Sequence, residues 1–318
     1  MNSITFTCEV VTPMFLAGAD GIELDLRPPS IKGAMRFWWR SMNGYLSISD
    51  LRKQEADIFG GTDEKVGRSK LLVRTSHPEL TAVNQRPLPH HTGGDNCLIC
   101  RQNPSEKYCK KGYKNKAIPI GYRYETNLSL TREIIVNPDN TFDICRLESL
   151  FLLTCLFGGL GKRSRRGYGS VIINKKNEAL FNMPSTLQDV MLHLGKFNSH
   201  FEFDNSYCPS SIVLSRSSFP ERTYPYIESI QIGQRVYPDY DSLLLEIGKA
   251  SHDFKNKNDH SLGYAEKGDR LASPVCVSVL KKGLKDYCAI ITTLHMATKD
   301  DKFKVNRQKQ ENFKNAIL

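Results

Sequence analysis

Cysteine and histidine side chains gather in one stretch of the sequence at a spacing that suits a metal ion. The candidate ligands are His90, His91, Cys97, Cys100 and Cys109. Three thiolates and one imidazole form a complete tetrahedral ligand set for Zn²⁺. The surrounding segment 77–120 is poor in apolar residues, so a bound ion would take the place of a missing core. The spacing predicts a structural zinc with either histidine as the fourth ligand, although a C-x2-C pair also serves thiol–disulfide chemistry.

Three carboxylates in the loop that follows the first predicted strand offer a second kind of chemistry. Asp20, Glu23 and Asp25 lie within a few residues of one another. Carboxylates gathered in this way bind a divalent metal or act as general acid and base. Acidic residues in a loop are more often simply solvated. The solvated loop is therefore the expectation, and a metal-dependent nuclease remains an alternative.

A third group of residues combines glycine with positive charge in the stretch 158–171, GGLGKRSRRGYGSV. Glycine adopts positive φ and lets a backbone approach a ligand closely. Clustered cations suit a polyanion such as the phosphate backbone of a nucleic acid. The alternative is a solvated basic loop that joins a helix to a strand. The predicted binding residues are Gly159, Gly161, Lys162, Arg163, Arg165, Arg166, Gly167, Tyr168 and Gly169.

The segment 30–44, SIKGAMRFWWRSMNG, predicts a helix with a basic face. At 100° per residue one narrow stripe forms the core face and contains Ile31, Met35, Trp38 and Met42. A neighbouring sector contains the candidate RNA-binding residues Lys32, Arg36, Trp39 and Arg40. Cations beside an indole suit a phosphate backbone and a stacked base. A solvated face with a half-packed Trp39 is the alternative.

Composition limits the possible partners and the compartment. The chain has 318 residues and a formal net charge of +10, so an acidic partner is expected, first of all a nucleic acid. A membrane partner is not expected, because the longest apolar run, 150–157, is too short to span a bilayer. The N-terminal residues lack the pattern of a secretion signal. The nine cysteines should therefore be reduced, and we expect a cytoplasmic protein.

The periodicity of the first half predicts an α+β domain. The predicted order is strand, helix, strand, insertion, strand, helix, glycine-rich loop, strand, with the insertion at 77–120. Apart from the insertion this is βαββαβ, the ferredoxin-like arrangement of many RNA-binding modules of the RRM kind. The second half contains predicted helices and strands that are compatible with a diverged second domain of the same type. We therefore expect tandem ferredoxin-like domains at 1–176 and 177–318.

Four segments resemble a known family. They are TPMFLAGAD at 12–20, LRPPSIKGAMRFWWR at 26–40, FGGLGKRSRRGYGSV at 157–171 and GDRLASPVCVSV at 268–279. They are similar to the RAMP superfamily of CRISPR RNA-binding proteins, and within it to the first subunits of the Cmr complex, the type III-B effector. The cysteine-rich insertion departs from the pattern expected of the family's core.

The resemblance implies a function as well as a fold. It implies a non-catalytic RNA-binding subunit of an antiviral complex that contacts the 3′ part of the guide RNA, the target RNA or both. Other Cmr or RAMP subunits would be its partners. Carried over by position, Lys32, Arg36 and Arg40 match the motif helix, and the glycines and cations of 159–169 match the motif loop.

Two other classes of function remain open. The first is a RAMP endoribonuclease, either metal-dependent through Asp20, Glu23 or Asp25, or processing guide RNA with a histidine. None of the eight histidines lies in the motif helix or the motif loop, and this disfavours an enzyme that processes guide RNA with a histidine. The second class is a zinc-dependent interaction module whose basic surface contacts an acidic protein.

Overall fold

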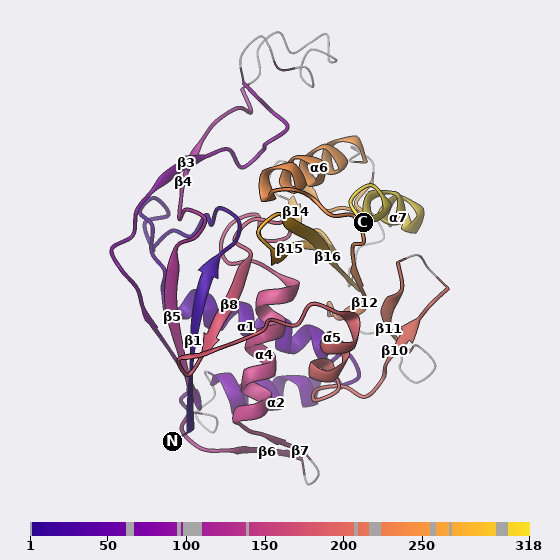
Figure 1. Cartoon of the computed structure of the whole chain (residues 1–318). Helices are drawn as coiled ribbons and strands as arrows, with labels where there is room; N and C mark the ends of the chain where they lie inside the picture. The colour runs from indigo at the N-terminus through magenta and orange to yellow at the C-terminus, as the bar shows by residue number, and fades with distance from the viewer. Residues whose placement is uncertain are drawn as a thin grey trace.

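The computed structural model describes residues 2–61, 67–93, 97, 110–137, 140–206, 209–215, 224–254, 259–266, 269–296 and 305–318. Two five-stranded antiparallel sheets lie side by side, with helices between them and on the outside (Figure 1). Within these ranges, no helix combines the length and apolar character that crossing a bilayer requires.

The first sheet has the predicted ferredoxin-like arrangement. Its elements, in chain order, are β1 (Asn2–Val10), α1 (Pro28–Met42), β2 (Leu71–Ser76), β5 (Arg123–Leu130), α4 (Ile144–Phe157) and β8 (Val171–Lys176). The strands lie in the spatial order β2-β5-β1-β8, with the short β9 (Ala179–Leu180) outside β8. This order places the first and third strands of the βαββαβ unit in the centre. The ferredoxin-like prediction is therefore confirmed for this half.

Local sequence signals explain most element boundaries. Helix α1 starts at Pro28 because proline suits the first helical position, where no N–H donor is needed. Helix α2 (Ile48–Phe59) begins where the Ser47 side chain accepts a hydrogen bond from Asp50 N. It ends at Gly60, whose φ of 83° suits glycine.

Two short hairpins interrupt the predicted pattern. The single strand predicted after the insertion divides into β5 and β6 (Ile134–Asn137), because β6 pairs with β7 (Asn140–Phe142). Within the predicted insertion, β3 (Val83–Gln85) pairs with β4 (Asn115–Ala117).

Helix α4 lies between the two sheets and is buried on most sides. It contacts β1, β5 and β8 of the first sheet and β15 (Val275–Gly283) and β16 (Asp286–Leu294) of the second. Its sequence, ICRLESLFLLTCLF, has few charges, which is typical of a helix without a solvent face. Ser278 of β15 also donates a 2.6 Å hydrogen bond to Leu156 O near the end of α4.

The second sheet repeats the layout of the first with one change in connectivity. Its strand order is β10-β11-β12-β16-β15, with β10 (Phe201–Asp204), β11 (Ser211–Leu214) and β12 (Ile227–Ile232). The series β12, α6 (Tyr240–Asp253), β15, β16, α7 (Arg307–Asn315) matches βαββα. The strand beside β12 is β11, which precedes it in the chain, whereas β8 follows β1. The second unit is thus a diverged ferredoxin-like unit.

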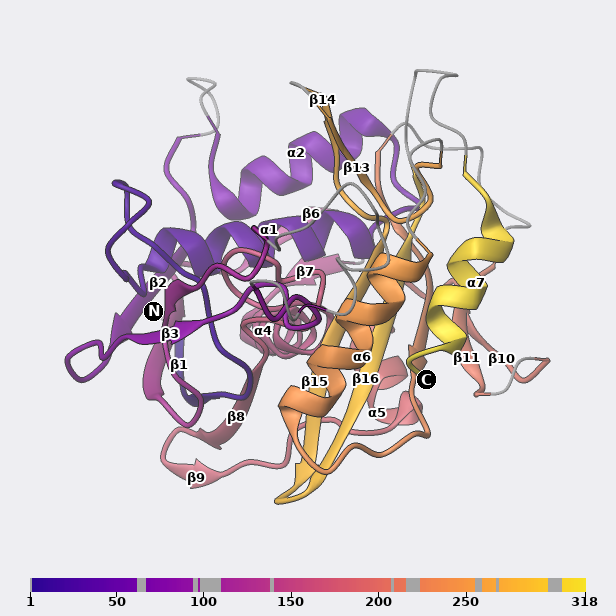
Figure 2. The same ribbon diagram turned by 90° about the horizontal axis from the view of Figure 1, so that it is seen from above.

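Successive side chains of β15 and β16 point to opposite faces of the second sheet, and both faces are buried. One set of side chains joins the α4 core and includes Cys276, Leu280, Cys288 and Ile290. The alternate set packs beneath α6 and α7 and includes Val275, Val277, Ala289 and Ile291. Helix α6 accordingly lies across the outside of β15 and β16 (Figure 2). Burial on both faces explains why most residues of 275–280 and 288–294 are apolar.

The two halves are not separated by a simple linker. β9, which follows residue 176, pairs with β8 and extends the first sheet. Helix α5 (Leu187–Leu194) packs on α4, and one apolar core includes buried residues of both halves. The boundary at 176/177 therefore stays a prediction.

Candidate nucleic-acid interface

The glycine loop, residues 158–170 between α4 and β8, is hydrogen-bonded on both edges to the protein's own backbone. On one edge Lys162 N donates to Phe15 O across 2.8 Å, and Gly169 N donates to Pro13 O across 3.1 Å. On the other edge Gly167 N donates to Val277 O across 2.8 Å. The loop therefore ties the segment after β1 to strand β15 of the second sheet.

The glycines of this loop are required by close internal packing. Gly161 has a φ of 90°, and a Cβ there would lie 2.3 Å from Phe15 O. Gly169 has a φ of 69°, and a Cβ there would lie 2.0 Å from Leu160 O. Both positions therefore exclude any other residue by conformation and by space. Gly159 and Gly167 are similarly enclosed, so all four glycines have a structural role independent of any ligand.

Arg165 and Arg166 hold the glycine loop against the second half of the chain. Arg166 donates to Val275 O at 2.8 Å and to Leu262 O at 2.9 Å. Arg165 donates to Ser273 O. Burial lowers the pKa of Arg166 to about 10, so its guanidinium stays charged at neutral pH. Because the partners are neutral carbonyls, neither positive charge is cancelled by an ion pair with these groups.

Arg163 differs from these two arginines, because among the described residues no hydrogen bond or ion pair holds its guanidinium. Its Nε is buried and has no hydrogen-bond partner in the described part of the chain. Its φ is 62°, a left-handed conformation that costs energy for a residue with a Cβ. Burial lowers the pKa of this guanidinium, although Tyr168 and Tyr113 oppose the shift. Lys162 beside it is exposed.

Two aromatic residues predicted to bind RNA, Trp39 and Tyr168, lie in the core. Trp39 is 2% exposed and packs edge-to-face on Phe59 of α2. Tyr168 is 1% exposed, lies 5.1 Å from the Phe15 ring, and its hydroxyl donates to Arg86 O. Neither ring presents a face on which a base could stack. The helical-wheel prediction that Trp39 belongs to the exposed basic sector is wrong because α2 covers that part of α1.

The cations of α1 are exposed but share one carboxylate. Arg36 and Arg40 both form ion pairs with Glu55 of α2, and their side chains are 45% and 50% exposed. Glu55 is 5% exposed, so the carboxylate is sunk beneath the two guanidinium groups. Lys32 Nζ donates to Leu71 O at 3.2 Å, and burial lowers its pKa. The α1 face therefore has a net positive charge, but Glu55 makes this charge smaller than the number of lysines and arginines on the helix suggests.

The glycine loop and α1 are in contact at Gly158, where a Cβ would lie 2.8 Å from Trp38 Nε1, and at Arg165. The Arg165 guanidinium lies 5.2 Å from the centre of the Phe37 ring. Phe37 belongs to α1, the helix that also carries Arg36 and Arg40. The two predicted RNA-binding surfaces are thus neighbours in the tertiary structure.

A cavity of about 570 Å³ opens where the glycine loop meets three other segments. The loop contributes Arg163, Arg165 and Arg166, and the insertion contributes His90 and His91. The remaining walls come from the end of α6 and from the segment 262–273, which contains the hairpin of β13 (Tyr264–Glu266) and β14 (Asp269–Leu271). The structure therefore joins the predicted loop, part of the predicted zinc segment and the fourth family-like segment in one cavity.

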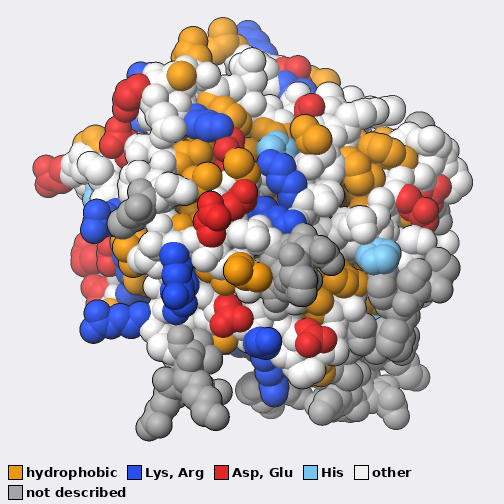
Figure 3. Space-filling model, turned by 90° about the horizontal axis from the view of Figure 1, so that it is seen from below, with side chains coloured by type: hydrophobic (Ala, Val, Ile, Leu, Met, Phe, Trp, Pro, Cys, Tyr) orange, Lys and Arg blue, Asp and Glu red, His pale blue; other side chains and the backbone are white. Residues whose placement is uncertain are grey.

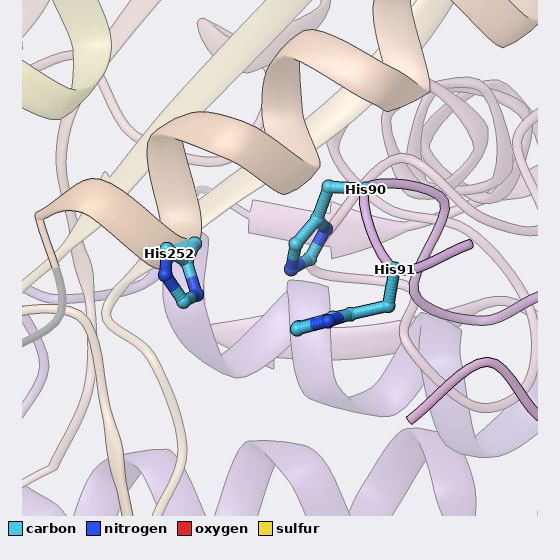
Figure 4. Close-up of side chains that lie close together, drawn as sticks. All are labelled: His90, His91 and His252. Atoms are coloured by element: carbon cyan, nitrogen blue, oxygen red, sulfur yellow. The ribbon is translucent and has the colours of Figure 1, made fainter. Parts of the chain in front are cut away.

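Three histidines meet in this cavity, and the sequence indicated only two of them. His90, His91 and His252 offer nitrogens that all lie within 4.8 Å of one another (Figure 4). His252 lies in the last turn of α6, far from the others in sequence. Burial lowers the pKa of His90 to about 3, helped by the charges of the other two histidines and Arg163. His90 is therefore neutral at neutral pH.

The predicted zinc ligands are only partly described. Cys97 is 1% exposed, and its Sγ lies 3.8 Å from Nδ1 of His91. Two ligands of one tetrahedral zinc, with bonds of about 2.3 and 2.0 Å, lie about 3.5 Å apart. Cys100 and Cys109 lie outside the described residues. The structural zinc therefore stays a prediction.

The three carboxylates of the acidic loop do not assemble into a site. Asp20 accepts hydrogen bonds from the backbone N–H groups of Ile22 and Glu23, and Glu23 pairs with Lys116 at 2.9 Å. In the described part of the chain, the three histidines are the only group of three or more metal-ligating side chains within ligand distance of one another. The geometry does not support a metal-dependent nuclease at Asp20, Glu23 and Asp25.

Charge is unevenly arranged over the surface. On the face seen from below, lysine and arginine side chains lie in small separate groups between acidic and apolar ones (Figure 3). The cavity, in contrast, brings three arginines and Lys111 together. We therefore regard the cavity and its rim, rather than the whole surface, as the candidate interface.

Comparison with known proteins identifies the family. The sequence profile of the RAMP superfamily matches residues 7–172, more than half of the chain. The chain belongs to the RAMP superfamily. The matched region of this RAMP chain begins in β1 and ends in β8, and it contains α1 and the glycine loop.

Two curated relatives of this RAMP chain come from the archaeon Pyrococcus furiosus. The CRISPR system Cmr subunit Cmr1-2 is 26% identical over 191 residues, which cover 57% of this chain and 100% of that protein. The Cmr subunit Cmr1-1 is 30% identical over 190 residues, which cover 57% of this chain and 48% of that protein. The predicted similarity to Cmr first subunits is confirmed.

Solved structures show that the fold extends over the whole chain. The crystal structure of apo Cmr1 from Pyrococcus furiosus matches with a TM-score of 0.55 and 18% identity, covering 100% of this chain and 96% of that one. A chain of the type III-B Cmr-beta complex, bound to cognate target RNA and AMPPnP in the presence of ssDNA, matches with a TM-score of 0.58 and 11% identity. That match covers 99% of each chain. The RAMP-type fold prediction is confirmed for both halves.

Proposed function

We propose that this protein is a non-catalytic RNA-binding subunit of a type III-B CRISPR RNA-guided complex. Membership of the RAMP superfamily and similarity to Cmr subunits support this role. The structural observation that carries it is Arg163, a cation with an unpaired Nε that lines a cavity together with Arg165, Arg166 and Lys111. The guide RNA, the target RNA or both are the proposed ligands, with other Cmr or RAMP subunits as protein partners.

The cavity and the α1 face would divide the contacts to RNA. Arg163 and Lys162 would contact phosphates from the glycine loop, and Arg36 and Arg40 would contact phosphates from α1. The chemistry is recognition of a sugar-phosphate chain by cations, which carries little sequence information. Because Trp39 and Tyr168 are buried, stacking on these two rings has no part in the proposal.

The direct test is binding of single-stranded RNA to the purified chain over a range of salt concentrations. Log affinity should fall by roughly 0.7 to 0.9 units per tenfold increase in salt for each contacted phosphate. The RNA should remain intact with Mg²⁺ or Zn²⁺ present. Absence of binding at low salt, or failure to co-purify with a guide RNA and other Cmr-type subunits, would contradict the proposal.

A guide-processing endoribonuclease is the second candidate, and one observation favours it. The histidine cluster lies beside the arginines of the glycine loop, although no histidine is near that loop in sequence. A neutral imidazole beside cations has the components for general-base attack of a 2′-hydroxyl on its neighbouring phosphate. Cleavage that needs no metal and is lost in His90→Ala and His252→Ala would establish this function in place of the first.

A further inference from the structure

We propose that His90, His91 and His252 bind one transition-metal ion of the Zn²⁺ class, with a coordination position open to the arginine-lined cavity. This site differs from the predicted cysteine-rich one because His252 belongs to α6. It does not rest on the proposed RNA-binding function. It would connect the insertion to the second ferredoxin-like unit through a single ion.

The positions of the three rings are the first support. The ring centres of His90 and His91 are 4.4 Å apart, and His252 lies 5.7 and 5.8 Å from them. The rings point into a common space from two separate segments (Figure 4). In a tetrahedral site with Zn–N bonds of about 2.0 Å, nitrogens lie about 3.3 Å apart. The nitrogens here, within 4.8 Å of one another, need only small side-chain rotations to reach that geometry.

Gly248 in the interior of α6 is the second, independent support. A Cβ at this position would lie 2.5 Å from Nδ1 of His90. Glycine inside a helix costs about 1 kcal/mol relative to alanine. This helix therefore carries a destabilising residue at the one turn where the His90 ring lies against it. The gap at Gly248 is what lets the insertion place its histidines within reach of His252.

The burial of two of the three histidines is the third support for a metal site. His90 is 8% exposed and His91 is 2% exposed, whereas His252 stands at the open side. Nδ1 of His90 is buried against Gly248, which leaves Nε2 as the nitrogen that this ring can offer to an ion. Cys97 lies against Nδ1 of His91, a contact of the kind that orients a ligating histidine.

The surrounding cations set a condition on binding. Lys111 and Arg163 line the same cavity and repel a bare dication. An anion at the open coordination position offsets this repulsion, and at about 0.15 M salt the screening length is about 8 Å. Chloride or a phosphate oxygen would serve as that anion. The ion is expected to be of the class that prefers imidazole, such as Zn²⁺ or Co²⁺, and not Mg²⁺ or Ca²⁺.

The test is titration of the full chain with Co²⁺ in 0.15 M NaCl, followed by visible absorption and by competition with Zn²⁺. His252→Ala is the principal variant, because His252 is exposed and its loss should not unfold the chain. His77→Ala is the matched control, because His77 is an exposed histidine outside the cavity. We expect His252→Ala to bind one ion fewer, or at least tenfold more weakly, while His77→Ala matches the wild type.

A Cys97→Ser variant separates this site from the cysteine-rich one. For the three-histidine site, Cys97→Ser should retain the ion, and the Co²⁺ spectrum of that ion should lack the intense near-ultraviolet bands of a thiolate ligand. The proposal is overturned if His252→Ala binds as many ions as tightly as the wild type. It is also overturned if all bound Co²⁺ shows thiolate bands and disappears in Cys97→Ser. RNA binding, measured separately with EDTA present, reports on the proposed function alone.

Discussion

The glycine loop and helix α1 carry the same kind of side chain in different electrostatic surroundings. In the loop, Arg165 and Arg166 donate to backbone carbonyls, which are dipoles without net charge. On α1, Arg36 and Arg40 share the carboxylate of Glu55. Each loop arginine thus keeps a full positive charge, whereas the α1 pair has about one net charge between two side chains. The loop should therefore contribute more to RNA affinity than α1 does.

The comparison also separates structural from binding arginines within the loop. Arg166 is held by three carbonyl oxygens, counting that of Arg165, and is an internal connection between the two halves. Arg163 lacks such partners within the described residues and faces the cavity. Two arginines three positions apart in the same loop thus have different roles, which the number of arginines in the sequence does not reveal.

The largest expected effect is on stability, from Arg166→Ala. Removing the guanidinium breaks three hydrogen bonds and leaves Leu262 O without this donor, while Arg165 O and Val275 O keep Val277 N and Ser273 Oγ, so the loss should cost about 3 kcal/mol. The melting temperature should fall by roughly 6 °C. Arg52→Ala on the exposed face of α2 is the control and should change it little. An unchanged melting temperature in Arg166→Ala would show that the loop does not tie the two halves together.

The next effect is on RNA affinity, from Arg163→Ala. We expect about tenfold weaker binding, equivalent to about 1.4 kcal/mol, with an unchanged or slightly raised melting temperature. Stability should not suffer because the buried Nε has no hydrogen bond to lose within the described chain. Lys53→Ala on α2 removes the same charge elsewhere and should weaken binding far less. Equal losses in the two variants would mean that only net charge matters.

A smaller effect, in the opposite direction, is expected from Glu55→Gln. Neutralising Glu55 leaves the α1 arginines free to contact phosphates with full charge, so RNA affinity should rise roughly twofold to fivefold at low salt. Stability should fall by about 1 kcal/mol because two ion pairs are lost. Filter-binding or fluorescence titrations at two salt concentrations would measure this. Weaker RNA binding in Glu55→Gln would mean that the carboxylate positions the arginines rather than masking them.

The smallest effect concerns pH. Burial alone would raise the pKa of Glu9, but the hydrogen bond from Arg123, the charge of Lys281 and the Asn174 amide outweigh it and hold the pKa below its ordinary value. A carboxyl with a lowered folded-state pKa stabilises the protein above its unfolded value of about 4.3, and this stability is lost as pH falls through the folded value.

Glu9→Gln should therefore destabilise the protein by about 1 kcal/mol at pH 7 and by less near pH 3.5. Arg166→Ala, whose lost partners are carbonyls, should show no such convergence between the two pH values. Urea denaturation at both pH values measures the difference. A Glu9→Gln cost that is the same at pH 7 and pH 3.5 would contradict the ion-pair explanation.

Much of the fold was predictable because its local patterns are strong. Helix α4 corresponds to the helix predicted before the glycine-rich loop, and the structure shows its apolar run between the Asp143 cap and Gly158. The βαββαβ order of the first half followed from the hydrophobic periodicity and from the glycines and prolines between the elements. The connectivity of the second sheet was not predictable, because β11 replaces the expected last strand from an earlier position in the chain.

The candidate site was likewise predictable in part. The sequence by itself determined which segments carry cations, glycines and histidines, because composition and spacing are local properties. Only the tertiary structure decided which of them are available: α2 covers Trp39, backbone carbonyls engage Arg165 and Arg166, and α6 brings His252 to His90 and His91. Such contacts join residues far apart in the chain, so burial and pairing depend on packing rather than on any pattern within one segment.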